Sequence, residues 1–386
     1  MPYERKIIND PVFGFINIPK GLLYDIVRHP LLQRLTRIKQ VGLSSVVYPG
    51  AQHTRFQHSL GAFHLMSEAI TQLASKGNFI FDSEAEAVQA AILLHDIGHG
   101  PFSHVLEDTI VKGVSHEEIS LMLMERMNKE MNGQLSLAIQ IFKDEYPKRF
   151  LHQLVSGQLD MDRLDYLRRD SFYTGVTEGN IGSARIIKML DVADDRLVIE
   201  SKGIYSIENF LTARRLMYWQ VYLHKTSVAY EKMLISTLLR AKELASQGVE
   251  LFASPALRFF LYNDINPTEF YNNPDCLENF IQLDDNDIWT ALKVWSTHTD
   301  KVLSTLSTGM INRNIFKVEI SSEPISEDRK KELTLHISQQ LGITLSEANY
   351  FVSTPSIEKN MTRQMTVLTL STKTALSKIL PKHRTC

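Results

Sequence analysis

The stretch AAILLHDIGHGPFSH, residues 90–104, decides how the sequence is interpreted. Its apolar residues run directly into the adjacent pair His95 and Asp96, and His99 and His104 follow, separated by glycines and a proline. Because glycine permits sharp backbone turns, we expect the helix to end at this pair and the next segment to fold back. His99 and His104 are therefore expected to face the same cavity as the pair.

Seven of the thirteen histidines fall between residues 53 and 116, which marks this region as the candidate site. A lone imidazole is commonly a hydrogen-bonded structural residue, and His64 is interpreted in this way. Neighbouring residues on a helix point about 100° apart, so His95 and Asp96 can share one ion only if other elements complete the shell. In a helical bundle, His58 and Asp162 can project to the same point. Imidazole and carboxylate ligands together suit a divalent cation such as manganese, iron, nickel, zinc or magnesium.

The segment LDMDRLDYLRRD, residues 159–170, is the second informative stretch. On a helix, Asp162 and Tyr166 share a face, and so do Arg163 and Tyr166. A run of charges is commonly a solvated helix face. The interspersed leucines instead indicate a packed helix, and buried charges then need partners.

The composition is that of an ordinary globular protein. The chain has 386 residues with 42 Lys and Arg against 44 Asp and Glu, so nothing in its bulk charge points to nucleic acid. The two cysteines, Cys276 and Cys386, lie far apart, which argues against a disulfide framework and fits a reducing compartment. No apolar run approaches the ~20 residues that span a bilayer, so we expect a cytoplasmic protein without membrane partners.

Apolar spacing predicts a mainly α fold. The expected helices cover residues 21–39, 59–77, 82–96, 116–131, 135–144, 150–170, 182–191, 206–244 and 286–306. A hairpin is expected near 195–205, with Lys202 and Gly203 at its turn. After about residue 312, β-branched segments flank one helix-like stretch, which predicts a helical domain over 1–310 and a small α/β module over 311–386.

The order His58, His95–Asp96, Asp162 resembles the pattern of HD-domain metal-dependent phosphohydrolases. Longer blocks resemble one branch of that family, the deoxynucleoside triphosphate (dNTP) triphosphohydrolases, which has bacterial dGTPase-like members. These blocks are QRLTRIKQVGLSSVVYPGAQHTRFQHSLG (33–61), HDIGHGPFSH (95–104), SHEEIS (115–120) and LDMDRLDYLRRD (159–170). The resemblance covers roughly residues 10–240 and implies an HD helical bundle with its core at about 50–170.

The resemblance also implies roles for individual residues. The implied metal ligands are His58, His95, Asp96 and Asp162. The implied catalytic residues are His99, His104, Glu107 and His116. The implied substrate-binding residues are Gln40, Arg55, Arg163, Tyr166, Asp170, Arg214, Tyr222 and Lys225. The sequence departs from the family at Glu107, where relatives have aspartate, and at Tyr218, where eukaryotic relatives have histidine.

Three functions remain open from the sequence. The first is hydrolysis of a dNTP at its α-phosphate, which gives deoxynucleoside and tripolyphosphate, and the resemblance favours it. The second is hydrolysis of another nucleotide phosphate ester, and the third is nucleotide sensing without catalysis. The family further implies a homo-oligomer, a dimer or a tetramer, and a nucleotide activator.

Overall fold

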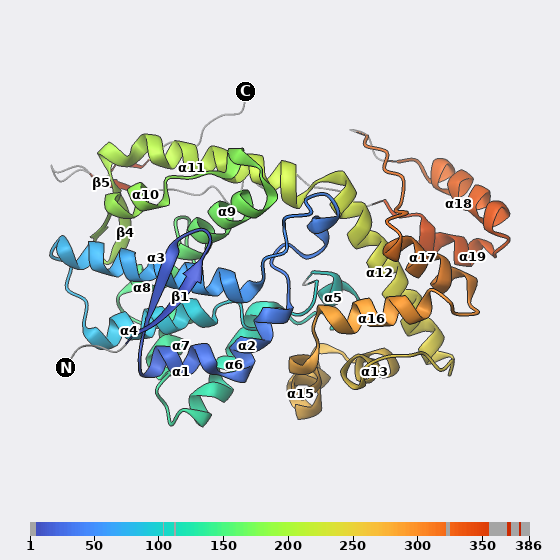
Figure 1. The fold of residues 1–386 in the computed structure, drawn as a ribbon, viewed down its shortest axis with the longest axis horizontal. Helices are drawn as coiled ribbons and strands as arrows, with labels where there is room; N and C mark the ends of the chain where they lie inside the picture. Colours follow the sequence, from blue (N-terminus) through green and yellow to red (C-terminus); the bar gives the residue numbers. More distant parts are fainter. Residues whose placement is uncertain are drawn as a thin grey trace.

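The computed structural model describes residues 5–102, 104–111, 113–321, 325–354, 369–371 and 378–379. Helices dominate, and the predicted mainly α fold is confirmed (Figure 1). Most helices that precede residue 218 gather in one half of the elongated molecule, and the later helices fill the other half. Among the described residues, none of the helices has both the length and the apolar character that crossing a membrane requires.

The first half is centred on α3 (Arg55–Ser75), which packs against α4 (Asp82–Leu94) and α9 (Met161–Thr174). Seven further helices surround these three: α1 (Leu22–Arg28), α2 (Pro30–Gln33), α6 (His116–Glu130), α7 (Ser136–Phe142), α8 (Arg149–Val155), α10 (Ser183–Met189) and α11 (Ile204–Met217). Leu60, Phe63 and Met66 of α3 are buried in this core.

The second half is organised by the long helix α12 (Lys225–Ser246), which runs diagonally through it in Figure 1. It packs against α5 (His104–Thr109) and α17 (Lys301–Ile311). The other helices here are α13 (Pro255–Tyr262), α14 (Pro267–Asn272), α15 (Pro274–Gln282), α16 (Asp285–Trp295), α18 (Glu327–Leu341) and α19 (Leu345–Ala348).

Two small sheets complete the described structure. β1 (Arg5–Asp10) and β2 (Gly14–Pro19) form an antiparallel hairpin whose Ile16 and Ile18 are fully buried. The second sheet has the order β3-β4-β5-β6, and its strands are β3 (Leu190–Ala193), β4 (Arg196–Glu200), β5 (Thr369–Ser371) and β6 (Lys378–Ile379). β5 runs parallel to β4, so a segment near the end of the sequence returns to the first half of the molecule.

Several predicted boundaries were wrong because local side-chain caps were overlooked. α3 begins at Arg55 rather than Ser59, since Thr54 and Gln57 form a capping box. Asp160 accepts hydrogen bonds from two backbone N–H groups and starts α9, which splits the helix predicted over 150–170. Asp300 caps α17 in the same way and splits the helix predicted over 286–306.

Two further predictions were corrected by backbone geometry. The helix predicted over 206–244 is interrupted by a π-helical turn at Tyr218–Tyr222. The hairpin near residue 195 turns at Asp194 and Asp195, which both have positive φ angles as a two-residue turn requires. Lys202 and Gly203, the predicted turn, instead lie in a 3-10 turn after β4.

The C-terminal segment was predicted as a β-α-β-β module. Its helix is present as α18, but residues 314–321 form no strand in the part of the chain that the structure describes. The strand predicted over 347–356 was wrong where it is described, because Leu345–Ala348 form α19 and Asn349–Phe351 continue as a 3-10 turn. The strand predicted over 364–372 is described only at β5, which pairs with β4 of the first half. The division of the chain at residue 310 stays a prediction.

Candidate active site and metal centre

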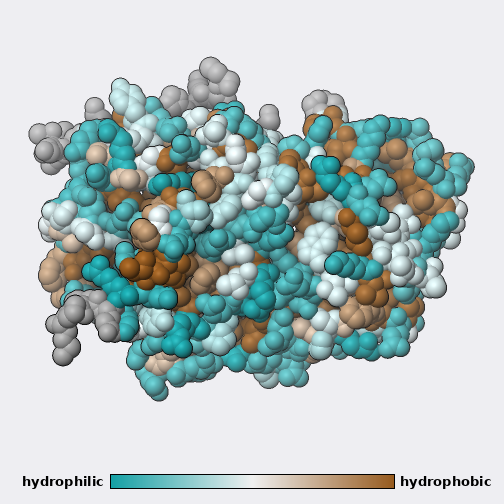
Figure 2. All heavy atoms as spheres, viewed as in Figure 1, coloured by the Kyte–Doolittle hydropathy of each residue, from teal (hydrophilic) through white to brown (hydrophobic). Residues whose placement is uncertain are grey.

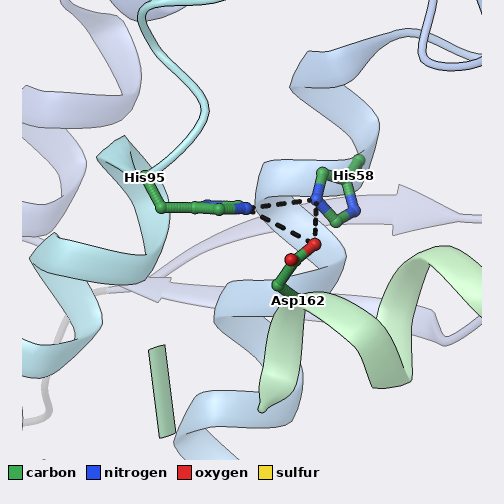
Figure 3. Close-up of side chains that lie close together, drawn as sticks. All are labelled: His58, His95 and Asp162. Carbon is green, nitrogen blue, oxygen red and sulfur yellow. Dashed lines mark hydrogen bonds and ion pairs between the residues drawn. The ribbon is translucent and has the colours of Figure 1, made fainter. Parts of the chain in front are cut away.

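Three side chains from three helices meet at one point (Figure 3). His58 comes from α3, His95 caps the C-terminal end of α4, and Asp162 lies in the first turn of α9. His58 Nε2 is 3.3 Å from His95 Nε2 and 3.2 Å from Asp162 Oδ1, and the third side of this triangle is 3.6 Å. The helix packing thus brings together three of the four predicted metal ligands.

Both histidines are oriented by bonds at their other ring nitrogen. His58 Nδ1 is 2.7 Å from Asp165 Oδ2, and His95 Nδ1 is 2.7 Å from the carbonyl oxygen of Ile92. In each ring Nδ1 therefore carries a hydrogen, and Nε2 is the atom that faces the triangle and can bind a metal. Metal-ligating histidines have this arrangement.

The donor set fits a divalent metal. Two ligand atoms that each lie about 2.1 Å from one ion are about 3.0–3.4 Å apart, depending on the coordination angle. The spacings among His58, His95 and Asp162 lie within or close to this range, and all three ligand atoms are within 4.8 Å of one another. This group can hold a metal ion.

Asp96, the fourth predicted ligand, lies at the edge of the group. Its oxygens are 3.4 Å from His95 Nε2 and 3.8 Å from His58 Nε2. Arg55 Nη1 donates to Asp96 Oδ2 at 2.6 Å, and His99 Nε2 is 3.2 Å from Oδ1. The carboxylate is thus fixed beside the triangle, and its role as a ligand stays a prediction.

The electrostatics of the group favour a positive charge at its centre. Burial lowers the pKa of His58, but the hydrogen bonds to Asp162 and Asp165 outweigh it and raise that pKa to about 10. Burial raises the pKa of Asp162, but the two histidines outweigh it and lower that pKa below its usual range. Asp162 therefore stays ionised and offers a charged ligand.

The segment after α4 is shaped by a close contact with α6. A Cβ on Gly98 would lie 2.2 Å from the carbonyl oxygen of His116 and 2.3 Å from the backbone nitrogen of Ser120. Ser120 Oγ accepts from the Gly98 N–H and donates to the His95 carbonyl oxygen. Gly98 is therefore needed for close approach, whereas the sequence had suggested a sharp turn, and its φ angle is not positive.

His99 and His116 stack face to face beside the triangle, with ring centroids 3.9 Å apart. Burial, and next the charge of Arg55, lower the pKa of His99 to about 3, so this ring is neutral at neutral pH. A neutral His99 facing Asp96 donates through Nε2 and leaves Nδ1 as an acceptor. This buried Nδ1 has no hydrogen-bond partner among the described residues.

A second cluster lies further along α9 and contains three of the predicted substrate-binding residues, Tyr166, Asp170 and Tyr222. Tyr222 donates its hydroxyl hydrogen to Asp170 Oδ2 at 2.6 Å, and His53 Nε2 is 2.7 Å from Asp170 Oδ1. The Tyr222 ring packs edge to face against Tyr166 and Tyr218, at 6.1 and 5.8 Å between centroids. The π-helical turn positions Tyr218 and Tyr222, and such turns are frequent at functional sites.

The four cationic side chains among the predicted substrate-binding residues occupy different environments. Arg163 donates to the buried carboxylate of Asp160, so its guanidinium is held within the protein. Arg214 is half-buried and donates to Gln158 at 3.4 Å. Lys225 is exposed at the first residue of α12. Arg55 differs from these three because it contacts a ligand candidate directly, through its bond to Asp96.

Three predicted residues remain to be placed. The backbone N–H of Gln40 donates to the carbonyl oxygen of His53, while its buried Oε1 has no partner among the described residues. His104 and Glu107 lie in α5, and their side chains fall outside the described structure. Their predicted catalytic roles therefore stay predictions.

Comparison with known proteins agrees with this geometry. The family model described as HD domain matches residues 55–170, and the one described as HD associated region matches residues 181–253. The crystal structure of a phosphohydrolase from Bacteroides thetaiotaomicron VPI-5482 is 92% identical, with a TM-score of 0.96 over 97% of this chain and 94% of that chain. The chain belongs to the HD-domain phosphohydrolase family. The predicted resemblance is thereby confirmed, and the chain is a hydrolase.

Other relatives of this HD phosphohydrolase are more distant. Protein YwfO of Bacillus subtilis (strain 168) is 32% identical over 321 residues, which cover 81% of this chain and 72% of that protein. The deoxynucleoside triphosphate triphosphohydrolase SAMHD1 homolog of Dictyostelium discoideum is 30% identical over 333 residues, or 81% of this chain. Human SAMHD1 is 27% identical over 310 residues, or 69% of this chain. The matches span 60% and 49% of those two triphosphohydrolases.

Sequence reasoning missed residues that support the HD site without belonging to it. Asp165 orients His58, and Arg169 forms a bidentate pair with Asp165. The spacing of four residues between Asp165 and Arg169 was the available signal for this pair. No pattern in the sequence pointed to His53, whose partner Asp170 is distant along the chain.

Proposed function

We propose that this HD phosphohydrolase is a dNTP triphosphohydrolase, which cleaves at the α-phosphate and releases deoxynucleoside and tripolyphosphate. The observation that carries the proposal is the placement of two clusters on α9. Asp162 of the metal triangle begins the helix, and Asp170 with its tyrosine partner lies two turns further on. A nucleotide with its α-phosphate at the triangle would place its sugar beside Tyr166 and Asp170.

The triangle would hold the cation. A divalent ion bound there supplies a water of lowered pKa and polarises a phosphoryl oxygen. We infer that His58, His95 and Asp162 are its ligands and that Asp96 completes the shell. The ion is proposed to be manganese, iron, nickel, zinc or magnesium, in keeping with the mixed imidazole and carboxylate donors.

The protein's own residues would then perform the remaining steps. Arg55 places a guanidinium beside the triangle, where it can neutralise phosphate charge. The acceptor Nδ1 of His99 can receive a hydrogen bond from the attacking water. As water bonds to the α-phosphorus and the bond to the sugar 5′-oxygen breaks, we propose that the water gives up its proton to His99 Nδ1. His116, whose ring stacks on His99, is the residue proposed to give the leaving oxygen a proton.

Arg163, Arg214 and Lys225 are proposed to bind the outer phosphates once substrate is present, and Gln40 and Tyr222 to contact the sugar and base. His104 and Glu107 are proposed members of the catalytic network. For Arg163 this role requires exchange of its Asp160 partner for a phosphate.

The test is turnover of each of the four dNTPs, singly and mixed, by chelator-treated protein reloaded with Mn²⁺. Chromatography should show deoxynucleoside and tripolyphosphate from wild type and from the control His64→Ala, and none from His95→Ala. His64 lies on the same helix α3, where its ring contacts Phe13 and Glu68 rather than the triangle. Activity in the mixture alone would reveal a nucleotide activator. Orthophosphate or an opened cyclic ester from other nucleotides, with intact dNTPs, would contradict the proposal.

We also infer a cytoplasmic homo-oligomer. Ile7 and Phe15 lie on the outward face of the β1–β2 hairpin and are 58% and 66% exposed. Hydrophobic side chains gather over this region in Figure 2, and exposed apolar groups of this kind are typical of contact surfaces. Light scattering should give a dimer or tetramer mass for wild type and a smaller mass for Phe15→Ser.

A further inference from the structure

A buried chain of charged side chains connects the N-terminal hairpin to the metal triangle. Asp10, at the end of β1, accepts from Arg169 Nη1 at 2.8 Å through Oδ2. Arg169 donates through Nε and Nη2 to the two oxygens of Asp165, each at 3.0 Å. Asp165 Oδ2 in turn is 2.7 Å from Nδ1 of His58. Three hydrogen-bonded steps thus join a hairpin carboxylate to a metal-ligand candidate.

This chain is enclosed by the protein. The side chains of Arg169, Asp165 and His58 have no exposed surface, and that of Asp10 is 5% exposed. α3 carries a glycine where the chain passes, since a Cβ on Gly61 would lie 1.9 Å from Asp165 Oδ1 and 2.2 Å from Arg169 Nη2. The helix surface is therefore shaped to admit the ion pair.

Asp10 has separate contacts with each of its two oxygens. Oδ1 accepts from the backbone N–H groups of Val12 and Phe13 and so fixes the hairpin turn, whereas Oδ2 receives Arg169. The Phe13 ring lies against the same guanidinium at 5.6 Å. The turn is consequently built around Arg169, and Asp10 balances part of its charge.

The charge balance between Asp10 and Arg169 affects the hydrogen bond from His58 to Asp165. Asp165 is the acceptor that holds the His58 ring and makes its Nε2 a stronger donor to a metal. A guanidinium without a second carboxylate would draw more of the Asp165 charge to itself and weaken the bond to His58. With Asp10 present, Arg169 lies between two carboxylates, and Asp165 retains charge for His58.

We propose that Asp10 is a positioning residue of the metal centre, acting on His58 through Arg169 and Asp165. The hairpin is then part of the metal-binding unit. This inference rests on the proposed metal centre, but it does not depend on which nucleotide is hydrolysed.

The test is a double-mutant cycle of Asp10→Asn and Arg169→Gln, with Mn²⁺ affinity of chelator-treated protein measured by calorimetry. The asparagine side chain keeps an oxygen for the turn, and its amide nitrogen replaces the charged oxygen that accepts from Arg169. Direct partners of metal-ligating histidines change affinity by 10–100-fold, so one step further out we expect a loss on the order of fivefold. In the Arg169→Gln background, Asp10→Asn should have no further effect. Asp25→Asn removes an exposed charge on α1 and should leave affinity unchanged.

The outcomes separate the two proposals. Wild-type affinity in Asp10→Asn, or an equal loss in both backgrounds, would overturn the role of Asp10 while leaving the metal centre intact. Failure of wild type to bind Mn²⁺ would overturn both the metal centre and the proposed role of Asp10. If Asp10→Asn does not fold, Arg169→Lys replaces it, because lysine keeps the charge but cannot span both carboxylates. The Arg169→Lys variant should also bind Mn²⁺ less tightly than wild type. Wild-type affinity in this variant would equally overturn the proposed role of Asp10.

Discussion

His53 and Asp170 form a buried pair that fixes the end of α9 to the segment before α3. His53 Nε2 lies 2.7 Å from Asp170 Oδ1, and the two side chains are 0% and 2% exposed. Tyr222 occupies the other carboxylate oxygen, and the His53 ring stacks on Tyr173 at 4.4 Å between centroids. The carboxylate proposed to contact the sugar is therefore held from both sides.

The first prediction is that His53→Ala lowers kcat/KM for dNTPs by about tenfold. A hydrogen bond to a charged group contributes about 1.5–3 kcal/mol, and its loss lets Asp170 leave its position. If Asp170 contacts the 3′-hydroxyl, a 2′,3′-dideoxynucleotide should lose much less of its kcat/KM than the dNTP. Steady-state kinetics on both substrates measures the difference.

His64→Ala is the matched control, because the His64 ring contacts Phe13 and Glu68 and not Asp170. It should leave both substrates unaffected. An equal loss for dNTP and dideoxynucleotide in His53→Ala would show that His53 supports the fold rather than the sugar contact.

The second prediction concerns metal removal. A ligand that binds only the folded state raises the midpoint of unfolding, so Mn²⁺ should raise the Tm of chelator-treated wild type. His95→Ala and Asp162→Asn remove one corner of the triangle each and should abolish the shift. Differential scanning fluorimetry with and without Mn²⁺ measures it. A full Mn²⁺ shift in both variants would place the ion elsewhere.

The local parts of the site were predictable from the sequence. The residues His58, His95 and Asp162 follow from the helix pattern and the family resemblance, and they meet in space. What the sequence could not provide was the set of partners that orient them. Asp165 and Arg169 were visible as charges on a packed helix, but the identity of their partners depends on how α3, α9 and the hairpin pack.

The fold shows the same division. Long apolar helices such as α4 were predicted almost to the residue, because periodicity and acidic N-terminal residues both mark them. Breaks within predicted helices were missed where a single Asp cap, or a π-helical turn, overrides an apolar pattern that continues across it. Pairing of β5 with β4 depends on residues far apart along the chain, for which local patterns carry no signal.

The third prediction tests the close packing of α3 on α9. A methyl group added by Gly61→Ala would collide with Asp165 Oδ1 and Arg169 Nη2. Relief of the clash requires the buried ion pair to move, so we expect a loss of unfolding free energy of about 3 kcal/mol. Urea unfolding followed by circular dichroism measures it.

Thr71→Ala is its control, since Thr71 is exposed on the same helix. That change should alter the unfolding free energy by about 0.5 kcal/mol or less. Wild-type stability in Gly61→Ala would mean that the α3–α9 contact is looser than the distances indicate.

The fourth prediction concerns pH and Glu84, whose buried carboxylate joins α4 to the segment before α8. Burial raises the pKa of Glu84, but hydrogen bonds from Lys148 and Tyr146 outweigh it and lower that pKa below the ordinary 4.5. The unfolded chain then binds more protons than the folded one as pH falls below about 5, so this stabilisation is present at neutral pH and is lost on acidification. Glu84→Gln should cost about 1–3 kcal/mol at pH 7, and its difference from wild type should shrink toward pH 3. Urea unfolding over a series of pH values measures the unfolding free energy of each variant. The control is Glu86→Gln, an exposed change on the same helix, which should match wild type at every pH. If the loss of unfolding free energy in Glu84→Gln does not change with pH, packing rather than charge is its cause.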